Sequence, residues 1–417
     1  MSREQFGEYE YWEDQEREHL ELIATAKALH NTRLFNLRLH SASNQMHAAI
    51  REFFDDLRST NAAHKTQRKN IERSFNTLVS NLIVNYSADP KQFTIYGRRD
   101  KDYPHERYNP LDIKLRGICA VADGLEELGY VENFVGFQRP QFFYGRKSRI
   151  RATDEFIRLL NQRASLVSGH VEEADHFELI VLRDAAGYDK HYSDTDVTDA
   201  LRKQVEDYNE LLSKCDIRVA SLESVAKPDR YRPERKRYHR VFNLEKFSLG
   251  GRYTGPWWQT AQKELRQRIL IDGDPTIECD FKAQHVHLLY HLAGKNYFEV
   301  HGAGDDPYII PGYGHEYRSL MKMVFLKLTG AKNRKGVNIG MGQWVASLEE
   351  YRNFDHKKAS EAFMAKHSAI MHLVFMRHSK HLSLTLQNID SSISQHVISE
   401  LQQLGIVALD IHDSFIV

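Results

Sequence analysis

The sequence is poor in the residues that build disulfide-rich and membrane-bound proteins. Its three cysteines, Cys119, Cys215 and Cys279, lie far apart and form no CxxC pair. A disulfide framework and a cysteine-rich zinc module are therefore excluded, and a reducing compartment is expected. No run approaches the ~18 consecutive apolar residues of a membrane-spanning helix. The N-terminal residues are acidic and polar, unlike a secretory signal, so we expect a cytoplasmic protein without a membrane partner.

An excess of charge of one sign is also lacking. The 57 Lys and Arg residues balance 57 Asp and Glu residues, so net charge indicates no polyanionic partner and only local clusters can. The chain has 10 prolines in 417 residues, which predicts short linkers. This length is enough for two or three domains, each with its own core.

The N-terminal part of the chain has the apolar spacing of helices. Apolar residues recur at near-helical intervals in three groups, which begin at Leu20, Ile50 and Ile71. We therefore predict a helical region over residues 1–84, with a structural or partner-binding role and no chemistry of its own.

Residues 85–165 combine a helix with two strands. The spacing predicts a helix over 117–128 that is capped by Gly129, then a strand over 130–137 and a returning strand over 145–153. Helices followed by a β-hairpin are typical of a winged helix. The hairpin is basic and has no acid from 139 to 152, and its cations are Arg139, Arg146, Lys147, Arg149 and Arg151. Such a wing is suited to DNA phosphates, and the alternative is a solvated basic loop.

Residues 166–247 are predicted to be a linking α/β segment. Strands are expected over 177–182 and 216–222, with a helix over 195–213 between them. A basic stretch follows at 226–240, which contains seven Lys and Arg residues and only two acidic residues. It includes Arg235, Lys236 and Arg237, with Tyr231 and Tyr238 interleaved. Such a stretch is typical of a nucleic-acid backbone track, and the alternative is a charged interdomain linker.

The last part of the chain, residues 248–417, carries the residues suited to catalysis. A strand over 276–279 is expected to end at Asp280, before an apolar helix. A helix over 317–332 has Arg318 and Lys322 on one face, and we expect no balancing acid beside that face. Near the end, an apolar strand runs to Ile411, and a turn and a second strand follow it.

Two carboxylates at strand ends and a cationic helix suit one chemistry. A pair of aspartates, Asp280 and Asp413, can hold two divalent cations. Mg²⁺ prefers such oxygen ligands, and Mn²⁺ can take its place. The cationic helix would neutralise a triphosphate as charge develops on it.

These residues resemble the palm and fingers of family A DNA polymerases and of single-subunit phage-type RNA polymerases. Asp280 matches the motif A aspartate, Arg318-x-x-x-Lys322 matches the motif B helix, and His412-Asp413-Ser414 matches motif C. Before them, Ser248 to Arg252 looks like the short T/DxxGR element. The segment GGRYTGPWWQ is also similar to polymerase-like proteins of phages and bacterial mobile elements. The resemblance covers residues 248–417, about two fifths of the chain.

The resemblance implies an α+β fold with a polymerase-like palm and helical fingers. It also implies template-directed nucleotidyl transfer, in which a primer 3′-OH attacks the α-phosphate of a nucleoside triphosphate on a DNA template. By this resemblance, Asp280 and Asp413 would bind two Mg²⁺ ions, and Arg318 and Lys322 would bind the triphosphate. Arg252 would lie near the primer–template junction, His285 would line the sugar pocket, and His412 would support the primer end.

The sequence departs from the family pattern at three places. His285 stands where the DNA polymerases have a glutamate that excludes ribose and the phage RNA polymerases have a glycine, so its bulk favours deoxynucleotides. Gly330 stands where motif B carries a stacking tyrosine. The chain ends four residues after Asp413, whereas related enzymes continue, so we expect a truncated palm or one without its closing strand and helix.

Two other functions stay open at this point. The HDSF form of motif C favours an RNA polymerase or primase. The missing tyrosine favours a non-catalytic winged-helix DNA-binding replication protein with a degenerate palm. Strand alternation further predicts that Cys279 points into the sheet and is inert, while Trp257 and Trp258 are expected either to stack on bases or to fill a core.

Overall fold

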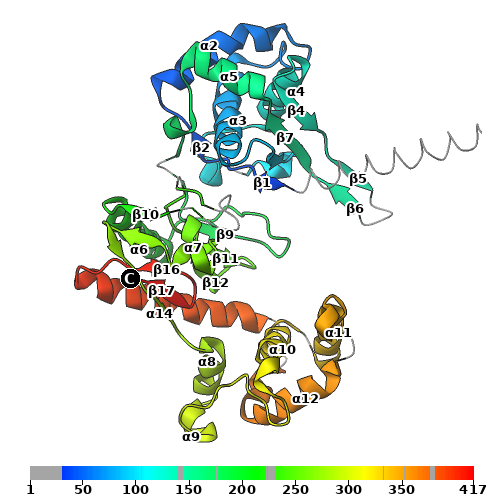
Figure 1. The fold of residues 1–417 in the computed structure, drawn as a ribbon, viewed down its shortest axis with the longest axis vertical. Coiled ribbons are helices and arrows are strands. Elements are labelled where there is room, and N and C mark those ends of the chain that lie inside the picture. The colour runs from blue at the N-terminus through cyan, green and yellow to red at the C-terminus, as the bar shows by residue number, and fades with distance from the viewer. Residues whose placement is uncertain are drawn as a thin grey trace, which may run out of the picture. The chain divides into compact units, whose positions relative to one another are not determined.

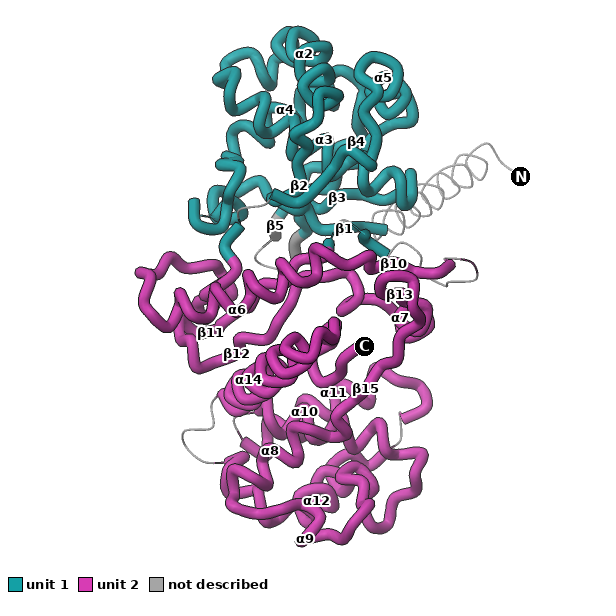
Figure 2. Tube along the Cα trace, turned by 90° about the vertical axis from the view of Figure 1, so that its left-hand side faces the viewer, with its two compact units in different colours: residues 1–178, 226–235 teal, residues 179–225, 236–417 magenta. Residues whose placement is uncertain are grey.

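The computed structural model describes residues 31–104, 106–139, 144–174, 177–221, 223, 231–233, 235–331, 333–351, 354–375 and 381–417. The fold is α+β, as the sequence predicts, with helices packed around small sheets. The chain forms two compact units (Figure 2): residues 1–178 with 226–235, and residues 179–225 with 236–417. In the described residues, no helix is both long and apolar enough to cross a bilayer.

Unit 1 has a four-stranded sheet covered by helices. The sheet has the order β1-β3-β7-β4, in which β1 and β3 are parallel and the other pairs are antiparallel. Its strands are β1 Thr32–Leu34, β3 Phe93–Tyr96, β7 Ser148–Ala152 and β4 Val131–Phe134. The helices are α2 Asn44–Ser59, α3 Arg68–Ala88, α4 Leu115–Glu127 and α5 Asp154–Ala164. Shorter elements are β2 Leu39–His40, β8 Glu172–Glu173, and 3-10 turns at Asp100–Asp102, Glu106–Tyr108 and Ser168–His170.

One hydrophobic core joins the two N-terminal segments that the sequence separates. Phe53 of α2 packs against the rings of Tyr130 and Phe156, with ring centroids 5.8 and 5.5 Å apart. The predicted boundary between residues 84 and 85 therefore falls inside this core. The first helical group, around Leu20, lies outside the described residues.

The predicted helix and hairpin of unit 1 are present. Gly129 ends α4 in the left-handed region (φ 74°), where its N–H donates to the Glu126 carbonyl oxygen at 2.9 Å. The returning strands pair as β4 with β7, and an outer pair, β5 Phe137–Arg139 and β6 Tyr144–Arg146, extends this hairpin (Figure 1). The pattern of capping glycine and alternating strands thus predicts this part correctly.

Unit 2 contains three small sheets and most of the helices. One sheet has the order β12-β11-β9, from β12 Lys246–Thr254, β11 His239–Asn243 and β9 Ile180–Leu182. A second has β10 Ile217–Val219, β13 Ile269–Ile271 and β14 Asp274–Pro275, and the third has β15 Glu278–Asp280, β17 Ser414–Ile416 and β16 Leu409–Asp410. The long helix α14 Leu382–Gln403 packs along β12 (Figure 1).

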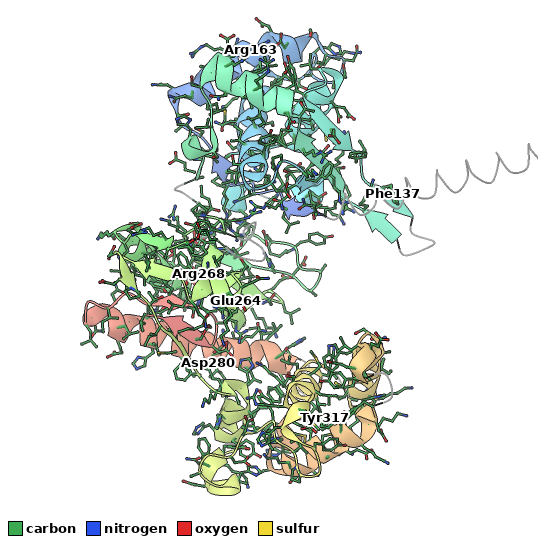
Figure 3. All side chains as sticks on the ribbon, in the orientation of Figure 1. Phe137, Arg163, Glu264, Arg268, Asp280 and Tyr317 are labelled. Carbon is green, nitrogen blue, oxygen red and sulfur yellow. The ribbon has the colours of Figure 1, made fainter. Side chains whose placement is uncertain are left out.

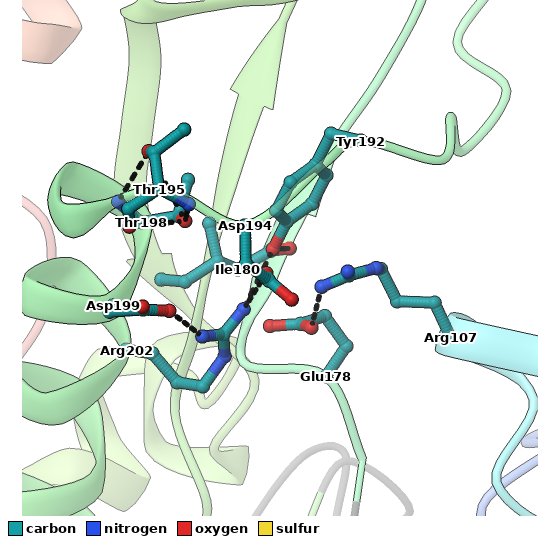
Figure 4. Close-up of polar contacts among 9 residues, drawn as sticks. All are labelled: Arg107, Glu178, Ile180, Tyr192, Asp194, Thr195, Thr198, Asp199 and Arg202. Atoms are coloured by element: carbon teal, nitrogen blue, oxygen red, sulfur yellow. Dashed lines mark hydrogen bonds and ion pairs between the residues drawn. The ribbon is translucent and has the colours of Figure 1, made fainter.

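The helix α6 Asp196–Ser213 starts where the sequence places it. Its first turn is closed by a capping box, in which Thr198 N donates to Thr195 Oγ1 and Thr195 N donates to Thr198 Oγ1. One turn later, Arg202 binds Asp194 and Asp199 at 2.8 and 2.7 Å (Figure 4). Arg202 Nη2 also lies 3.4 Å from Tyr192 Oη, which donates to the Ile180 carbonyl oxygen of β9 at 2.8 Å, and this contact links α6 to β9.

The remaining helices of unit 2 share a separate core that runs from Val286 to Leu386. They are α8 Gln284–Leu292, α9 Tyr297–His301, α10 Arg318–Gly330, α11 Arg334–Ala346, α12 His356–Lys366 and α13 Met371–Val374. The short helix α7 Lys263–Arg266 precedes them, and 3-10 turns lie at Trp257–Gln259, His315–Tyr317, Glu349–Tyr351 and Ser368–Ile370.

An aromatic cluster beneath the third sheet corrects two expectations. Tyr238 is fully buried, and its ring stacks on Tyr208 with centroids 4.9 Å apart. It therefore cannot stack on a base, as the basic-stretch hypothesis requires. Trp257 and Trp258 are also fully buried, so of the two alternatives the core is correct. Arg240, in the same stretch, is buried and donates to the Gly251 carbonyl oxygen at 2.7 Å.

Candidate active site

The two aspartates predicted to bind metal lie close together, Asp280 at the end of β15 and Asp413 in the turn before β17. Asp280 is the last residue of β15 and is paired with Ser414 of β17. One step further along, Phe281 N donates to the Asp413 carbonyl oxygen at 3.0 Å. The β16–β17 turn is closed by Ile411 N, which donates to the Ser414 carbonyl oxygen at 2.8 Å. The hairpin therefore brings Asp413 to the end of β15, where the label in Figure 3 marks Asp280.

Asp280, Asp413 and Lys322 form one electrostatic cluster. Burial raises the pKa of Asp280, the negative charge of Asp413 raises it further, and the positive charge of Lys322 opposes both. Two like charges at this spacing disfavour each other, and a cation between them relieves that repulsion. These carboxylates, with waters and substrate phosphates, fit the ligand set of Mg²⁺. In the described residues, no group of three or more His, Cys, Asp or Glu side chains is placed to hold a metal ion.

Arg318 has an acidic partner that the sequence did not predict. Its Nε donates to Asp306 Oδ2 at 2.7 Å, and its guanidinium lies 5.3 Å from the Tyr308 ring centroid. Burial alone would raise the pKa of Asp306, but the hydrogen bonds from Arg318 and Tyr308 N and the charges of Arg318 and Lys366 together lower it. The expectation of no nearby acid is wrong because the loop before α10 folds back onto the helix. Lys322, one turn on, is exposed.

A buried lysine holds this loop in place. Lys366 of α12 is 7% exposed in its side chain, and its Nζ binds Asp305 Oδ2 at 2.7 Å. The same Nζ donates to the carbonyl oxygens of Asp306 and Ile309 at 3.0 and 2.8 Å. The loop carries Tyr308, whose pKa rises to about 12, mainly through burial; the charge of Arg318 opposes the rise, and the charges of Asp306 and then Asp413 add to it. Sequence reasoning missed these residues, since a DDPY segment in a loop has no distinctive spacing.

A β-bulge aims Arg252 at the centre of unit 2. The register of β11 and β12 shifts between Val241 and Phe242, opposite the glycine pair of β12. Gly250 and Gly251 have φ values of 74° and 83°, and a Cβ on Gly251 would lie 2.5 Å from the Phe242 ring. Only glycine fits this conformation and this close approach. The Gly-Gly-Arg sequence thus determines the direction of the arginine that follows.

Arg252 is bound by a buried carboxylate on α14. Its Nε and Nη2 lie 2.7 and 2.5 Å from Asp390 Oδ2, and Asp390 is fully buried. Its Nη2 also lies 3.1 Å from His285 Nε2. Asn388, on the same helix, donates to the Gly250 carbonyl oxygen at 3.1 Å. Asp390 and Asn388 were not singled out from the sequence, although two polar residues in a helix that packs along a strand are a usable signal.

His412 lies between these groups and the aspartates. It has a left-handed φ of 67°, and its N–H donates to Asp410 Oδ2 at 3.3 Å. Burial lowers the pKa of His412, the positive charge of Arg252 adds to this effect, and Asp413 and Asp390 oppose it. The predicted residues Arg252, His285, His412 and Asp413 are therefore electrostatic or hydrogen-bonding neighbours.

Asp410 is another carboxylate that sequence reasoning missed. It is 1% exposed, and its Oδ2 accepts from Gln259 Nε2 at 3.1 Å. Burial raises the pKa of Asp410 to about 7, against hydrogen bonds that lower it, and the charge of Asp390 raises it further. Among the described residues, Oδ1 of Asp410, Oδ1 of Asp390 and Nδ1 of His412 are buried without a hydrogen-bond partner. A network of buried polar groups thus lies next to the two positions predicted to bind metal.

Two more residues lie around the predicted site, and one of them, Cys279, differs from expectation. Gly330 is the exposed last residue of α10, and a Cβ there would meet no described heavy atom within 4 Å, so packing does not require glycine. Cys279 is exposed, and its neighbour Ile277 is 66% exposed. The expectation that Cys279 points into a covered sheet is wrong, because nothing in the described residues covers that part of β15.

The predicted DNA-binding residues of unit 1 are paired with acids from other elements. Lys147 Nζ lies 3.0 Å from Asp102 Oδ1, and Arg151 Nη2 lies 2.7 Å from Glu132 Oε1. Arg149 Nη1 donates to the Lys147 carbonyl oxygen at 3.0 Å, and the Arg146 guanidinium lies 5.5 Å from the Phe137 ring centroid. The side chain of Arg139 lies outside the described residues. Residues 139–152, which contain no acid, are therefore still partly neutralised by Asp102 and by Glu132 of the paired strand.

The basic stretch at 226–240 is only partly described. Residues 226–230 and 234 lie outside the described residues, whereas Arg235, Lys236 and Arg237 are half-buried.

Comparisons of the chain with protein-family models, with curated proteins and with solved structures gave no match. The chemistry of the site therefore has to be argued from its own residues.

Proposed function

We propose that unit 2 catalyses template-directed nucleotidyl transfer and acts as a DNA polymerase that extends a primer on DNA. One observation carries the proposal: the fold gathers Asp280, Asp413 and Lys322 into one cluster, although they are widely separated in the sequence. Two carboxylates and an exposed cation on a helix suit a triphosphate that arrives with divalent cations. The cytoplasm, where free thiols persist, is the proposed location.

Each residue of the cluster has a role that follows from its position. Asp280 and Asp413 would hold two Mg²⁺ ions, which when bound activate the primer 3′-OH and stabilise the leaving pyrophosphate. Lys322 is exposed and lies within electrostatic range of Asp280, so it can bind a phosphate beside the metal ligands. Arg318 would have to exchange Asp306 for a phosphate oxygen. The ion pair holds its guanidinium ready at that place.

Arg252 and His412 would support the primer rather than the triphosphate. Arg252 is 27% exposed in its side chain while its anchor, Asp390, is fully buried, so the guanidinium is held rigidly at the surface of the site. His412 is half-buried next to Asp413. Rigid donors of this kind can bind the minor-groove edge or the sugar of a terminal base pair.

The topology of unit 1 supports a DNA-binding role. Helix α3, strand β3, helix α4 and the β4–β7 hairpin follow one another along the chain, and the sheet order β3-β7-β4 is compatible with a winged helix. A winged helix has a further helix before the one corresponding to α4, and in the described residues that place holds the 3-10 turns Asp100–Asp102 and Glu106–Tyr108. DNA phosphates would compete with Asp102 and Glu132 for Lys147 and Arg151. We propose that the wing positions the duplex without reading its sequence.

Primer extension tests the proposal directly. The whole chain would be given a primed DNA template, Mg²⁺ and dNTPs, beside Asp280→Asn, Asp413→Ala and the matched control Asp355→Asn. Asp355 caps α12, and asparagine caps equally well. We expect extension by the wild type and the control and its loss in both site variants. Equal extension by Asp280→Asn would refute the proposed role.

Two other functions are distinguished by the same assay. Extension with NTPs in place of dNTPs would identify an RNA polymerase or primase, which the HDSF sequence at 412–415 favours. No extension in either tube, with duplex still shifted in a gel and the shift lost when Arg146, Lys147 and Arg149 are neutralised, would identify a DNA-binding protein with a silent palm.

A further inference from the structure

The contacts of Arg252 determine where His285 carries its proton. Arginine has only donors, so the 3.1 Å contact from Arg252 Nη2 requires His285 Nε2 to accept. A protonated Nε2 would place two N–H groups against each other. The ring is therefore neutral at this contact, with its hydrogen on Nδ1.

Asp390 is what keeps Arg252 in this position. Both donors of Arg252 converge on one oxygen, Asp390 Oδ2, which also lies 3.7 Å from His285 Nε2. A fully buried carboxylate without its cation is strongly unfavourable, so the pair resists separation. The bulge at Gly250 and Gly251 fixes the backbone from which Arg252 departs. The guanidinium thus has one stable place, and His285 has one stable tautomer.

The rest of the His285 ring faces away from this pair. Its side chain is 22% exposed, and Nδ1 has no hydrogen-bond partner among the described residues. His285 lies at the N-terminal end of α8, a few residues after the proposed metal ligand Asp280. A nucleotide whose phosphates bind at Asp280 and Lys322 would therefore have its sugar close to this N–H group.

We infer that Asp390 is a positioning residue which, through Arg252, fixes the Nδ1–H tautomer of His285, and that this N–H donates to a hydroxyl of the nucleotide sugar. The inference rests on the proposed function and changes the expectation from the sequence. A bulky histidine would only exclude ribose, whereas an N–H donor recognises a hydroxyl group. Sugar selection would then depend on a hydrogen bond from His285 Nδ1, and Asp390 would maintain this donor by holding Arg252 in place.

The tautomer can be measured without catalysis. In the ¹⁵N-labelled chain, ring nitrogens of His285 are identified by the loss of their signals in His285→Asn. We expect the Nδ1–H pattern in the wild type and its loss in Asp390→Asn and in Arg252→Lys, which keeps the charge but not the fork. The second variant serves if the first does not fold. An Nε2–H pattern in the wild type, or an unchanged pattern in both variants, would overturn the inference.

Binding of the sugar is tested by titration with ATP, dATP, 2′,3′-dideoxy-ATP and inorganic tripolyphosphate in the presence of Mg²⁺. We expect the Nδ1–H signal to shift with a nucleotide that carries the recognised hydroxyl and to stay unchanged with tripolyphosphate. The dATP and dideoxy arms separate the 2′ from the 3′ hydroxyl. The same response to tripolyphosphate and ATP, or no response at all, would show that the N–H does not bind the sugar.

A pair of variants tests selectivity in primer extension. The amide nitrogen of asparagine takes the place of Nδ1, whereas that of glutamine takes the place of Nε2. His285→Asn should keep the wild-type preference among the three nucleotides, and His285→Gln should change it roughly threefold to tenfold, the worth of one hydrogen bond. His396→Gln, on an exposed position of α14, is the control.

These outcomes separate the inference from the proposed function. If the wild type extends no primer but the tautomer and the ATP response are as expected, the polymerase proposal fails and the sugar contact stands. If the wild type extends primers while His285→Asn and His285→Gln both keep its preference among the three nucleotides, the sugar contact fails and the polymerase stands.

Discussion

Asparagine at position 410 should stabilise the protein at neutral pH and not at acidic pH. Burial raises the pKa of Asp410 from 3.8 to about 7, so the folded state binds a proton that the unfolded state releases. Between these two pKa values the unfolded state holds fewer protons, and the free energy of unfolding therefore falls as pH rises. The loss is complete above pH 7 and amounts to about 4 kcal/mol as an upper figure.

The Asp410→Asn variant removes this loss because it cannot ionise. Its amide oxygen can still accept from His412 N and Gln259 Nε2, the two donors that bind Oδ2 in the wild type. We expect equal free energies of unfolding near pH 4 and a variant that is more stable by about 2–4 kcal/mol at pH 8.

Denaturant unfolding followed by tryptophan fluorescence measures this difference. Trp258 Nε1 donates to Tyr238 Oη at 2.6 Å, and Tyr238 Oη donates to the Asp410 carbonyl oxygen at 2.8 Å, so the fluorophore lies beside the substitution. A stability difference that is the same at pH 4 and pH 8 would refute the reasoning. So would a variant that is less stable at pH 8, since it would mean that the carboxylate is charged and favourably bound.

Three further predictions concern the site. Asp280 must be ionised to bind a cation, and its pKa is raised. On acidification, activity should therefore be lost at a higher pH than the usual pKa of an aspartate would give. Lys322→Met should move this limit to still higher pH in kcat/KM profiles, and an unmoved limit would contradict the electrostatic cluster. Gly251→Ala should lower the free energy of unfolding by about 2–4 kcal/mol. The control Gly405→Ala should lower it by about 1 kcal/mol, because a Cβ there meets no described atom. Equal losses in the two variants would argue against the bulge. Lys366→Met should speed hydrogen exchange in the loop that it holds and raise KM for nucleotides, and unchanged exchange would remove its role.

The elements that the sequence predicted best are those with a local signal. The helix over 195–213 has a capping box, the helix over 117–128 has its glycine cap, and the strands of the wing alternate. The pairing of Asp280 and Asp413 followed from a strand that ends in one aspartate and a hairpin turn that carries the other. These features depend on neighbours in the chain, and local chemistry is sufficient to predict them.

The residues that sequence reasoning missed act through contacts between distant segments. Asp390 becomes important only when α14 packs along β12, and Asp306 only when its loop folds back onto α10. Tyr238 reads as an aromatic within a basic stretch until the partner ring of Tyr208 is known. Composition and spacing carry no information on such pairs, because the tertiary structure decides which polar group is buried beside which.

The exposure of Cys279 gives the site a built-in chemical handle. Burial raises the pKa of the Cys119 and Cys215 thiols, which lowers their thiolate fraction and slows their alkylation. Cys279 is exposed and stands next to Asp280. A maleimide or iodoacetamide should therefore label this thiol first, within one residue of the proposed metal ligand. Occupancy of the site then becomes visible as protection of a single natural cysteine, in a chain that needs no substitution to report it.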